Sequence, residues 1–194
     1  MTNKELVSNA LEYLQVSTCY DKGFWCQWFT KSEYDRVNTQ YNGVNDKYGN
    51  AKLVGTNVYA ADCICWIKQL LNNGSVRKRL SYSEMAANPL GDCTNEAFYN
   101  KLYDCCEPEN AMPGYGLATT GHAALYIGSG QWLDYNYTTG QNGIALHTGF
   151  AGTKFKCGKI PGVSYEDDTP IVDTERAILT SFCDWLIDSY LKNR

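Results

Sequence analysis

The chain has 194 residues, which suits a single domain of ordinary size with its own hydrophobic core. A formal net charge of −4 and the lack of a lysine- or arginine-rich run argue against a protein that binds nucleic acid through its phosphates. The first residues lack the build of a signal peptide, and no window reaches the roughly 18 apolar residues of a membrane span. We therefore expect a product made in a cytoplasm without a membrane span.

The first half of the chain contains two predicted helices separated by a long segment without periodicity. Apolar residues recur at three- and four-residue steps over residues 3–15, which predicts an amphipathic helix. Residues 18–61 carry several glycines and scattered aromatic residues, so we expect mostly loop, long enough to have a function. Asp62 is a good N-cap for a second helix, which ends at the glycine-containing segment 72–74. Cys63 would therefore occupy the first turn of this helix.

The second half is predicted to form a short helix and then a small antiparallel sheet. The helix is expected over residues 96–103, and a turn at 112–114 follows it. Apolar residues then alternate over 123–127 and end at Gly128-Ser129-Gly130, which is a hairpin signal. Further strands are predicted at 131–136, 144–147 and 154–160.

The end of the chain is predicted to be separate from this sheet. Residues 163–172 are polar and turn-prone, which indicates a linker. Apolar residues then share one face, which predicts a last helix within 173–194. This helix could dock on the domain or hold a partner chain, and the sequence does not choose between the two.

Nine cysteines are present, and because the number is odd at least one thiol is unpaired within the chain. A reducing compartment permits all of them to be thiols, as an enzyme with a thiolate nucleophile requires. Most are expected to be small buried apolar side chains: Cys19, Cys26, Cys93, Cys105, Cys106, Cys157 and Cys183.

Three residues of the pattern carry the chemistry of a thiolate nucleophile. A helix start would stabilise a thiolate at Cys63, because unpaired N–H groups and the positive end of the dipole lie there. His122 opens a predicted strand and could supply an imidazole. Asp134 follows His122 by 12 residues across the hairpin, and paired strands can bring such residues side by side. A carboxylate there would fix the imidazole tautomer and hold the ring toward the sulfur.

Each of these residues alone has a simpler interpretation. Cys63 could be a buried helix cysteine, His122 a turn or strand-edge histidine, and Asp134 a surface carboxylate. The joint pattern favours the nucleophile, its base and the group that orients the base. Cys65 is expected to pack, because two residues along a helix it points to another side. His147 is expected to have no catalytic part.

Neither a metal nor a cofactor is expected. A structural zinc site would need four ligands with close paired spacings such as Cys-x-x-Cys. The cysteine pairs here are Cys63-x-Cys65 and the adjacent Cys105-Cys106, and the two histidines are too dispersed to complete such a site.

The segments Asp62-Cys63-Ile64-Cys65-Trp66-Ile67-Lys68 and Gly121-His122-Ala123-Ala124-Leu125-Tyr126-Ile127-Gly128-Ser129-Gly130-Gln131-Trp132-Leu133-Asp134 resemble the NlpC (p-sixty) family of papain-like cell-wall cysteine peptidases. In that family the cysteine follows an aspartate at a helix start, and the histidine opens a Gly-His-x-Gly-Ile-Tyr-Ile-Gly-x-Gly hairpin. A third polar residue lies 12 positions after the histidine, at Asp134 here. The resemblance therefore implies Cys63 as nucleophile, His122 as base and Asp134 as the orienting residue.

The family also has a tyrosine in an upstream Tyr-x-x-Gly segment that helps to bind the oxyanion. Tyr20-Asp21-Lys22-Gly23 matches this segment, so the resemblance gives Tyr20 that role beside the backbone N–H of Cys63. The chain departs from the family where Cys65 replaces a small residue, and where Asp134 stands at a position that is often histidine. A longer interval before Cys63 implies an insertion at about 24–61, whose aromatic residues we expect to shape the substrate groove: Trp25, Trp28, Tyr34, Tyr41 and Tyr48.

The resemblance covers roughly residues 13–160 and implies a fold as well as a function. The implied fold is α+β, a papain-like catalytic domain over 1–162 with N-terminal helices packed on a small antiparallel sheet, followed by the extra C-terminal helix. The implied function is a peptidoglycan hydrolase, favoured as an endopeptidase, that cleaves an amide bond in the peptide part of the cell wall. The alternatives are an N-acetylmuramoyl-L-alanine amidase on the same scaffold and a non-catalytic wall or virion recognition module.

The long form of the domain is similar to bacteriophage lysins and tail-associated wall hydrolases. Such enzymes act on the wall after release by a holin or from the virion. In this setting the last helix could serve self-association or the attachment of a wall-binding partner.

Overall fold

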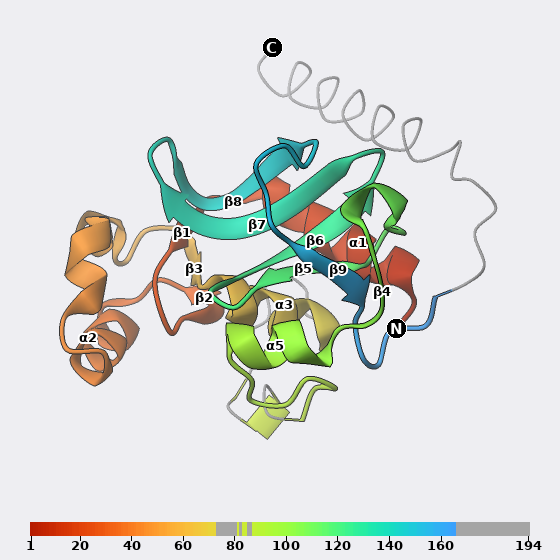
Figure 1. The fold of residues 1–194 in the computed structure, drawn as a ribbon. Coiled ribbons are helices and arrows are strands. Elements are labelled where there is room, and N and C mark those ends of the chain that lie inside the picture. The colour runs from red at the N-terminus through yellow and green to blue at the C-terminus, as the bar shows by residue number, and fades with distance from the viewer. Residues whose placement is uncertain (73–80, 82, 85–86, 166–194) are drawn as a thin grey trace, which may run out of the picture.

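The computed structural model describes residues 1–72, 81, 83–84 and 87–165, and these form a mixed α+β structure (Figure 1). Its larger sheet has six strands in the order β4-β9-β5-β6-β7-β8, and a second sheet has three strands in the order β1-β3-β2. The predicted helix at 173–194 and most of the predicted linker lie outside the described residues. Within the described part, none of the helices has the length and apolar character required to span a bilayer.

Helix α1 (Asn3–Glu12) confirms the first predicted helix, and a 3-10 turn over Tyr13–Gln15 continues it. Its N-terminus is closed by a capping box in which Thr2 and Glu5 each accept a hydrogen bond from the other's backbone N–H. The helix buries Leu6, Val7 and Ala10, three of the apolar residues at helical spacing, whereas Leu14 in the 3-10 turn is exposed.

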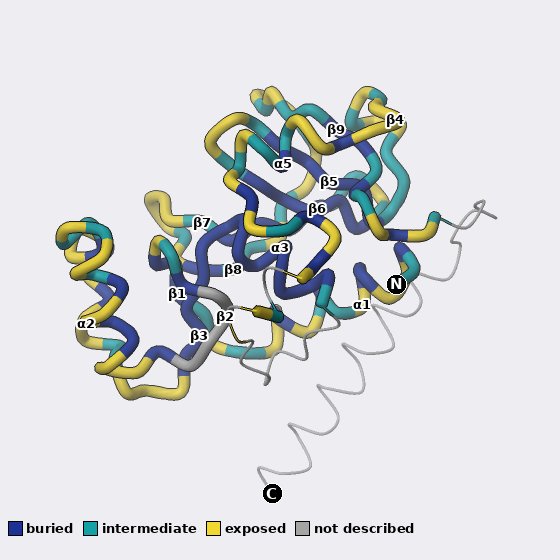
Figure 2. The backbone as a smooth tube through the Cα atoms, turned by 90° about the horizontal axis from the view of Figure 1, so that it is seen from below, coloured by how far each residue is buried: buried dark blue, intermediate teal, exposed yellow. Residues whose placement is uncertain are grey.

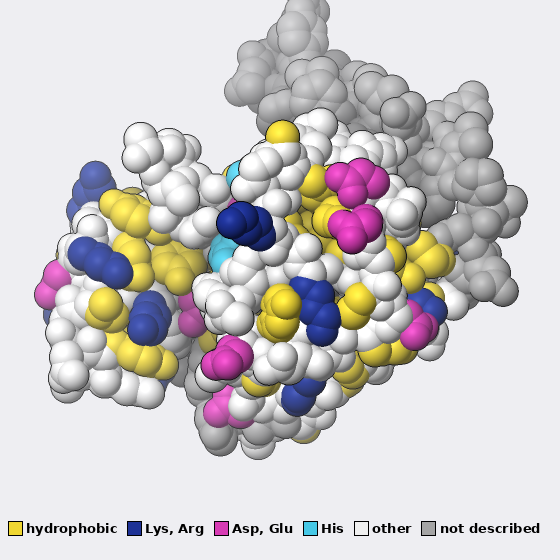
Figure 3. Space-filling model, viewed as in Figure 1, with side chains coloured by type: hydrophobic (Ala, Val, Ile, Leu, Met, Phe, Trp, Pro, Cys, Tyr) yellow, Lys and Arg dark blue, Asp and Glu magenta, His cyan; other side chains and the backbone are white. Residues whose placement is uncertain are grey.

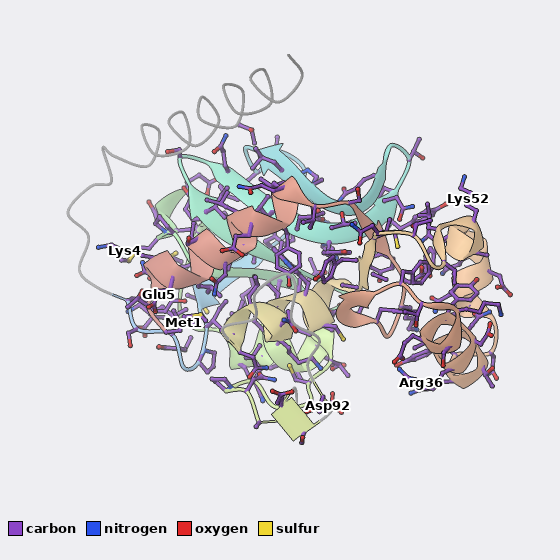
Figure 4. All side chains as sticks on the ribbon, turned by 180° about the vertical axis from the view of Figure 1, so that it is seen from behind. Met1, Lys4, Glu5, Arg36, Lys52 and Asp92 are labelled. Carbon is purple, nitrogen blue, oxygen red and sulfur yellow. The ribbon has the colours of Figure 1, made fainter. Side chains whose placement is uncertain are left out.

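Helix α3 (Cys63–Leu71) confirms the second predicted helix, and all of its residues are buried. It is covered on every side because it packs against β6, β7, α1 and β2. Figure 2 shows the buried backbone concentrated in α3 and the neighbouring strands. Even Lys68 in its last turn is 4% exposed, and its Nζ lies 3.1 Å from Oδ1 of the exposed Asp92. Figure 4 labels Asp92.

The six-stranded sheet is antiparallel throughout and contains all of the predicted strands. A two-residue turn joins β6 and β7, and both of its residues, Ser129 and Gly130, have positive φ, as a type I′ turn requires. The short helix α5 (Asn95–Lys101) confirms the predicted helix at 96–103 and packs against β5. The strands are β4 (Tyr103–Cys106), β5 (Gly116–Thr119), β6 (His122–Gly128), β7 (Gln131–Thr138), β8 (Gln141–Thr148) and β9 (Lys156–Lys159).

The prediction of mostly loop for residues 18–61 is wrong. The segment contains β1 (Thr18–Tyr20), β2 (Trp25–Trp28), α2 (Lys31–Gln40), two 3-10 turns (Val44–Tyr48 and Asn50–Leu53) and β3 (Tyr59–Ala61). Strands of three or four residues are too short to give a sustained period in the sequence. They are stabilised instead by a separate core cluster: Cys19, Phe24, Phe29, Tyr34, Val37, Val58 and Ala60.

This segment forms a lobe at one end of the molecule (Figure 1). Arg36 and Lys52 lie on it, far from Met1 and Glu5 at the start of the chain (Figure 4). Strand β3 is central in the small sheet, parallel to β1 and antiparallel to β2, and leads directly into α3. The lobe is therefore attached at the start of the helix that carries Cys63.

Candidate active site

Cys63 is the first residue of α3, where the buried strand β3 ends. Asp62 is the N-cap of this helix, and its Oδ1 accepts a hydrogen bond from the backbone N–H of Cys65 at 2.8 Å. The thiol therefore lies at the positive end of a helix dipole, which favours a negative charge on sulfur.

The second oxygen of Asp62 holds the turn that carries Tyr20. Its Oδ2 accepts a hydrogen bond from the backbone N–H of Gly23 at 2.8 Å. Gly23 has φ +80°, and a Cβ there would lie 2.2 Å from the ring of Tyr41, so the turn requires glycine. β1 runs parallel to β3, and Tyr20 is paired with Ala61, the last residue of β3. Tyr20 therefore lies at the end of the sheet where α3 and Cys63 begin.

His122 lies between the thiol and a carboxylate. Its Nε2 is 2.7 Å from Oδ2 of Asp134. The ring is also close enough to Cys63 for that residue to raise the pKa of the imidazole. An ionised carboxylate only accepts hydrogen bonds, so Nε2 of His122 carries the proton in this pair. The other ring nitrogen, Nδ1, is then left to take the proton of the thiol.

The strand register explains why the imidazole and the carboxylate meet. Ala124 of β6 is directly opposite Asp134 of β7, and directly opposed residues share one face of a sheet. His122 lies two residues before Ala124 on the same strand and therefore on the same face.

The surroundings of His122 and Asp134 favour a positive charge on the imidazole and a negative charge on the carboxylate. Burial alone would lower the pKa of His122, but hydrogen bonds with Asp134 and Cys63 raise this pKa from 6.5 to about 9. Burial would raise the pKa of Asp134, but hydrogen bonds from His122 and Gln141 outweigh it and hold this pKa below its usual range. The imidazole is thus readily protonated and the carboxylate ionised at neutral pH.

Asp134 has more donors than the sequence indicated. Gln141 donates from Nε2 to Oδ1 at 2.6 Å, and Nε2 of His147 lies 2.8 Å from the same oxygen. Asn136 donates more weakly to Oδ2 at 3.3 Å. The expectation for His147 was no catalytic part, yet the structure places this residue on the carboxylate that orients His122. Both histidine side chains reach the surface where the lobe meets the sheet (Figure 3).

Asn95 is a second residue that sequence reasoning missed. It lies at the start of α5, where its Oδ1 accepts a hydrogen bond from Sγ of Cys63 at 3.5 Å. Its Nδ2 donates to the backbone oxygen of Gly121 at 2.9 Å, next to His122. Asn95 therefore connects Cys63 with the start of β6, and Cys63 as a whole is only 2% exposed.

Tyr20 keeps its phenolic proton. Burial raises the pKa of Tyr20, and the nearby Cys63 and Asp62 raise it further. The ring meets Tyr48 edge-on at 5.2 Å between centroids, and Tyr48 meets Tyr137 at 5.0 Å. Tyr48 of the predicted groove thus lies at the site, whereas Tyr34 is buried in the core of the lobe.

The structure does not place the remaining predicted groove residues, Tyr41, Trp25 and Trp28, beside Cys63. Tyr41 packs against the core of the lobe, and the side chains of Trp25 and Trp28 lie outside the part of the chain that the structure describes.

The backbone of Tyr20 is held from two directions, because its N–H donates to Asn142 and its carbonyl accepts from Asn50. Asn142 comes from β8 and Asn50 from the lobe, so the turn is fixed between them.

The other cysteines agree in part with the expectation of buried apolar side chains. Cys19, Cys65, Cys93 and Cys157 are buried thiols, but the expectation is wrong for Cys105 and Cys106, which are exposed and half-buried on the edge strand β4. Among the described residues, no group of three or more His, Cys, Asp or Glu side chains is arranged to hold a metal ion.

No protein-family model matches the sequence, and comparison with curated proteins finds no match.

Proposed function

We propose that the protein is a papain-like cysteine hydrolase that cleaves an amide bond in the peptide part of peptidoglycan, as an endopeptidase. The observation that carries this proposal is the place of His122, which hydrogen-bonds with the carboxylate of Asp134 and interacts with Cys63, so that both residues raise its pKa. This order of nucleophile, base and orienting group is what acyl transfer by a thiolate requires.

In the proposed reaction, Cys63 attacks the carbonyl carbon of the scissile amide after its proton passes to His122. The tetrahedral oxyanion accepts hydrogen bonds from Tyr20 and from the backbone N–H of Cys63. His122 then gives its proton to the leaving amine as the C–N bond breaks, and a thioester remains on Cys63. Water, deprotonated by His122, hydrolyses the thioester and restores the thiol.

Two features support the papain-like assignment and the substrate class. The cysteine begins a buried helix that packs on an antiparallel sheet, and the base lies at the start of a neighbouring strand. The motifs around Cys63 and His122 resemble those of the NlpC family of wall peptidases, and the upstream Tyr20 turn is tied to Asp62. In the proposed setting, the enzyme reaches the wall after release by a holin or from a virion.

An amidase on the same scaffold would use the same three residues, because the chemistry of the two amides is the same. A recognition module that binds the wall without cutting is disfavoured, because binding alone does not require a thiol, an imidazole and a carboxylate in hydrogen-bonded order. These alternatives are outcomes of the experiment below.

The deciding experiment is digestion of purified peptidoglycan under reducing conditions, with the released fragments identified by mass spectrometry. New amino termini within the stem or cross-bridge support the endopeptidase, and glycan strands freed of their peptides identify the amidase. Cys63→Ala should release no fragments, whereas Cys65→Ala, a matched buried thiol on the same helix, should remain active. Wall binding by the wild-type protein without any release would refute the hydrolase.

A further inference from the structure

His122 and His147 share the carboxylate of Asp134. Their Nε2 atoms lie 2.7 and 2.8 Å from its two different oxygens, Oδ2 and Oδ1. The histidines belong to β6 and β8, which lie on either side of β7. The carboxylate therefore lies between two imidazoles rather than at the end of a chain of hydrogen bonds.

The strand register produces this arrangement. Trp132 of β7 is directly opposite His147 of β8, so His147 lies on the same face of the sheet as Asp134, two residues further along. His122 lies on that face too, two residues before Ala124, which is directly opposite Asp134. His122 and His147 are therefore displaced from Asp134 in opposite directions along the strands. The three side chains thus form one diagonal row across three adjacent strands.

The ring of His147 is itself anchored. It stacks on the indole of Trp132 with 4.0 Å between centroids and 15° between planes. Trp132 is in turn fixed by its Nε1, which donates to the backbone oxygen of Gly149 at 2.8 Å. His147 is therefore a held hydrogen-bond donor and not a freely rotating surface side chain.

The two oxygens of Asp134 are divided between different partners. Oδ1 takes its donors from β8, namely Gln141 at 2.6 Å and His147 at 2.8 Å. Oδ2 is then directed at His122, at 2.7 Å, with a longer hydrogen bond from Asn136 at 3.3 Å. Rotation of the carboxylate would break both bonds from β8, so these bonds fix the plane in which the base is oriented.

We propose that His147 is a positioning residue for the reaction, which holds Oδ1 of Asp134 so that Oδ2 orients His122 toward the thiol. This inference rests on the proposed function, because it adds a residue to the same site. His147 acts through Asp134 and not on the substrate.

The test compares kcat and KM on a soluble muropeptide for wild type, His147→Ala, His147→Gln and Leu146→Ala. His147→Ala should lower kcat about 10-fold with little change in KM, because the base is less well oriented. His147→Gln keeps an N–H donor and should restore most of kcat. Leu146→Ala alters an exposed neighbour on the same strand and should match wild type. Unchanged kcat in His147→Ala, no rescue by glutamine, or an equal loss in Leu146→Ala would overturn the proposal.

A second readout separates this inference from the proposed function. The rate at which iodoacetamide alkylates Cys63 reports the ionised thiol without any substrate. It should fall in His147→Ala and recover in His147→Gln. If this order is seen in a protein that cuts no wall peptide, the inference about His147 stands and the proposed function fails. If peptides are cut but the four proteins alkylate and turn over at the same rates, the proposed function stands and the inference fails.

Discussion

Asp62 accepts a hydrogen bond from the backbone N–H of Gly23, although the two residues are 39 positions apart. Its other oxygen caps the helix that begins at Cys63. One buried carboxylate thus joins the Tyr20 turn to the start of the helix that carries Cys63, in addition to the pairing of β1 with β3.

Asp62→Ala should therefore lower both stability and activity. Loss of a helix N-cap costs about 1–2 kcal/mol in free energy of unfolding, and the Tyr20 turn would also be released. Thr30→Ala removes the N-cap of α2 in the lobe and is the matched control. Urea unfolding should show a loss for both variants, with the larger loss for Asp62→Ala, and wall hydrolysis should fall much further in Asp62→Ala. Equal activities in the two variants would contradict the link.

Tyr20→Phe should lower kcat by roughly 100-fold, as the loss of one oxyanion donor does in other acyl-transfer enzymes. The hydroxyl is the only group removed, and the edge-on contact of the ring with Tyr48 can persist. Tyr137→Phe removes a hydroxyl from the exposed end of the same aromatic row and should have little effect. Wild-type kcat in Tyr20→Phe would exclude an oxyanion role.

The pH dependence should follow His122. Because the folded pKa is raised from 6.5 to about 9, the imidazolium stabilises the fold fully below pH 6.5 and this contribution is lost as the pH rises through about 9. Activity that needs the thiolate–imidazolium pair should fall over the same alkaline range. Asp134→Asn removes a cause of the raised pKa and should move the alkaline limb to lower pH, with a lower maximum.

Two comparisons check this assignment. Urea unfolding between pH 6 and 9 should lose less stability in His122→Gln than in wild type. Asp104→Asn alters a carboxylate on β4 that pairs with Lys159, and it should leave the activity profile in place. An alkaline limb that does not move in Asp134→Asn would show that another group controls it.

Asn95→Ala should increase the rate at which iodoacetamide reaches Cys63. The thiol donates to Asn95 Oδ1 at 3.5 Å, and Cys63 has little exposed surface, so removal of the amide should open access to the sulfur. Site-resolved mass spectrometry measures the rate, and the exposed Cys105 serves as an internal reference. A lower rate at Cys63 with an unchanged rate at Cys105 would contradict this account.

Local signals in the sequence were sufficient for part of the site. Asp62 indicated the start of α3, and the alternation around His122 with a Ser-Gly turn indicated the β6–β7 hairpin, so the meeting of His122 and Asp134 could be predicted. These features depend on capping and turn chemistry within a few residues.

The rest depends on long-range packing that leaves no local pattern. His147 reaches Asp134 only through the register of β8 on β7, and Asn95 reaches Cys63 only because α5 packs beside the sheet. The strands of the lobe escaped prediction because each is short and its core is assembled from residues scattered over the whole segment. Register and packing of this kind are set by tertiary contacts and not by propensity.

The most direct test of the thiolate mechanism is a titration of the wild-type protein with iodoacetamide, in which wall hydrolysis and the modification of each cysteine are measured in the same samples. Activity should decline in proportion to the fraction of Cys63 that is alkylated, whatever the state of Cys105. Full activity in protein whose Cys63 is completely alkylated would contradict the account.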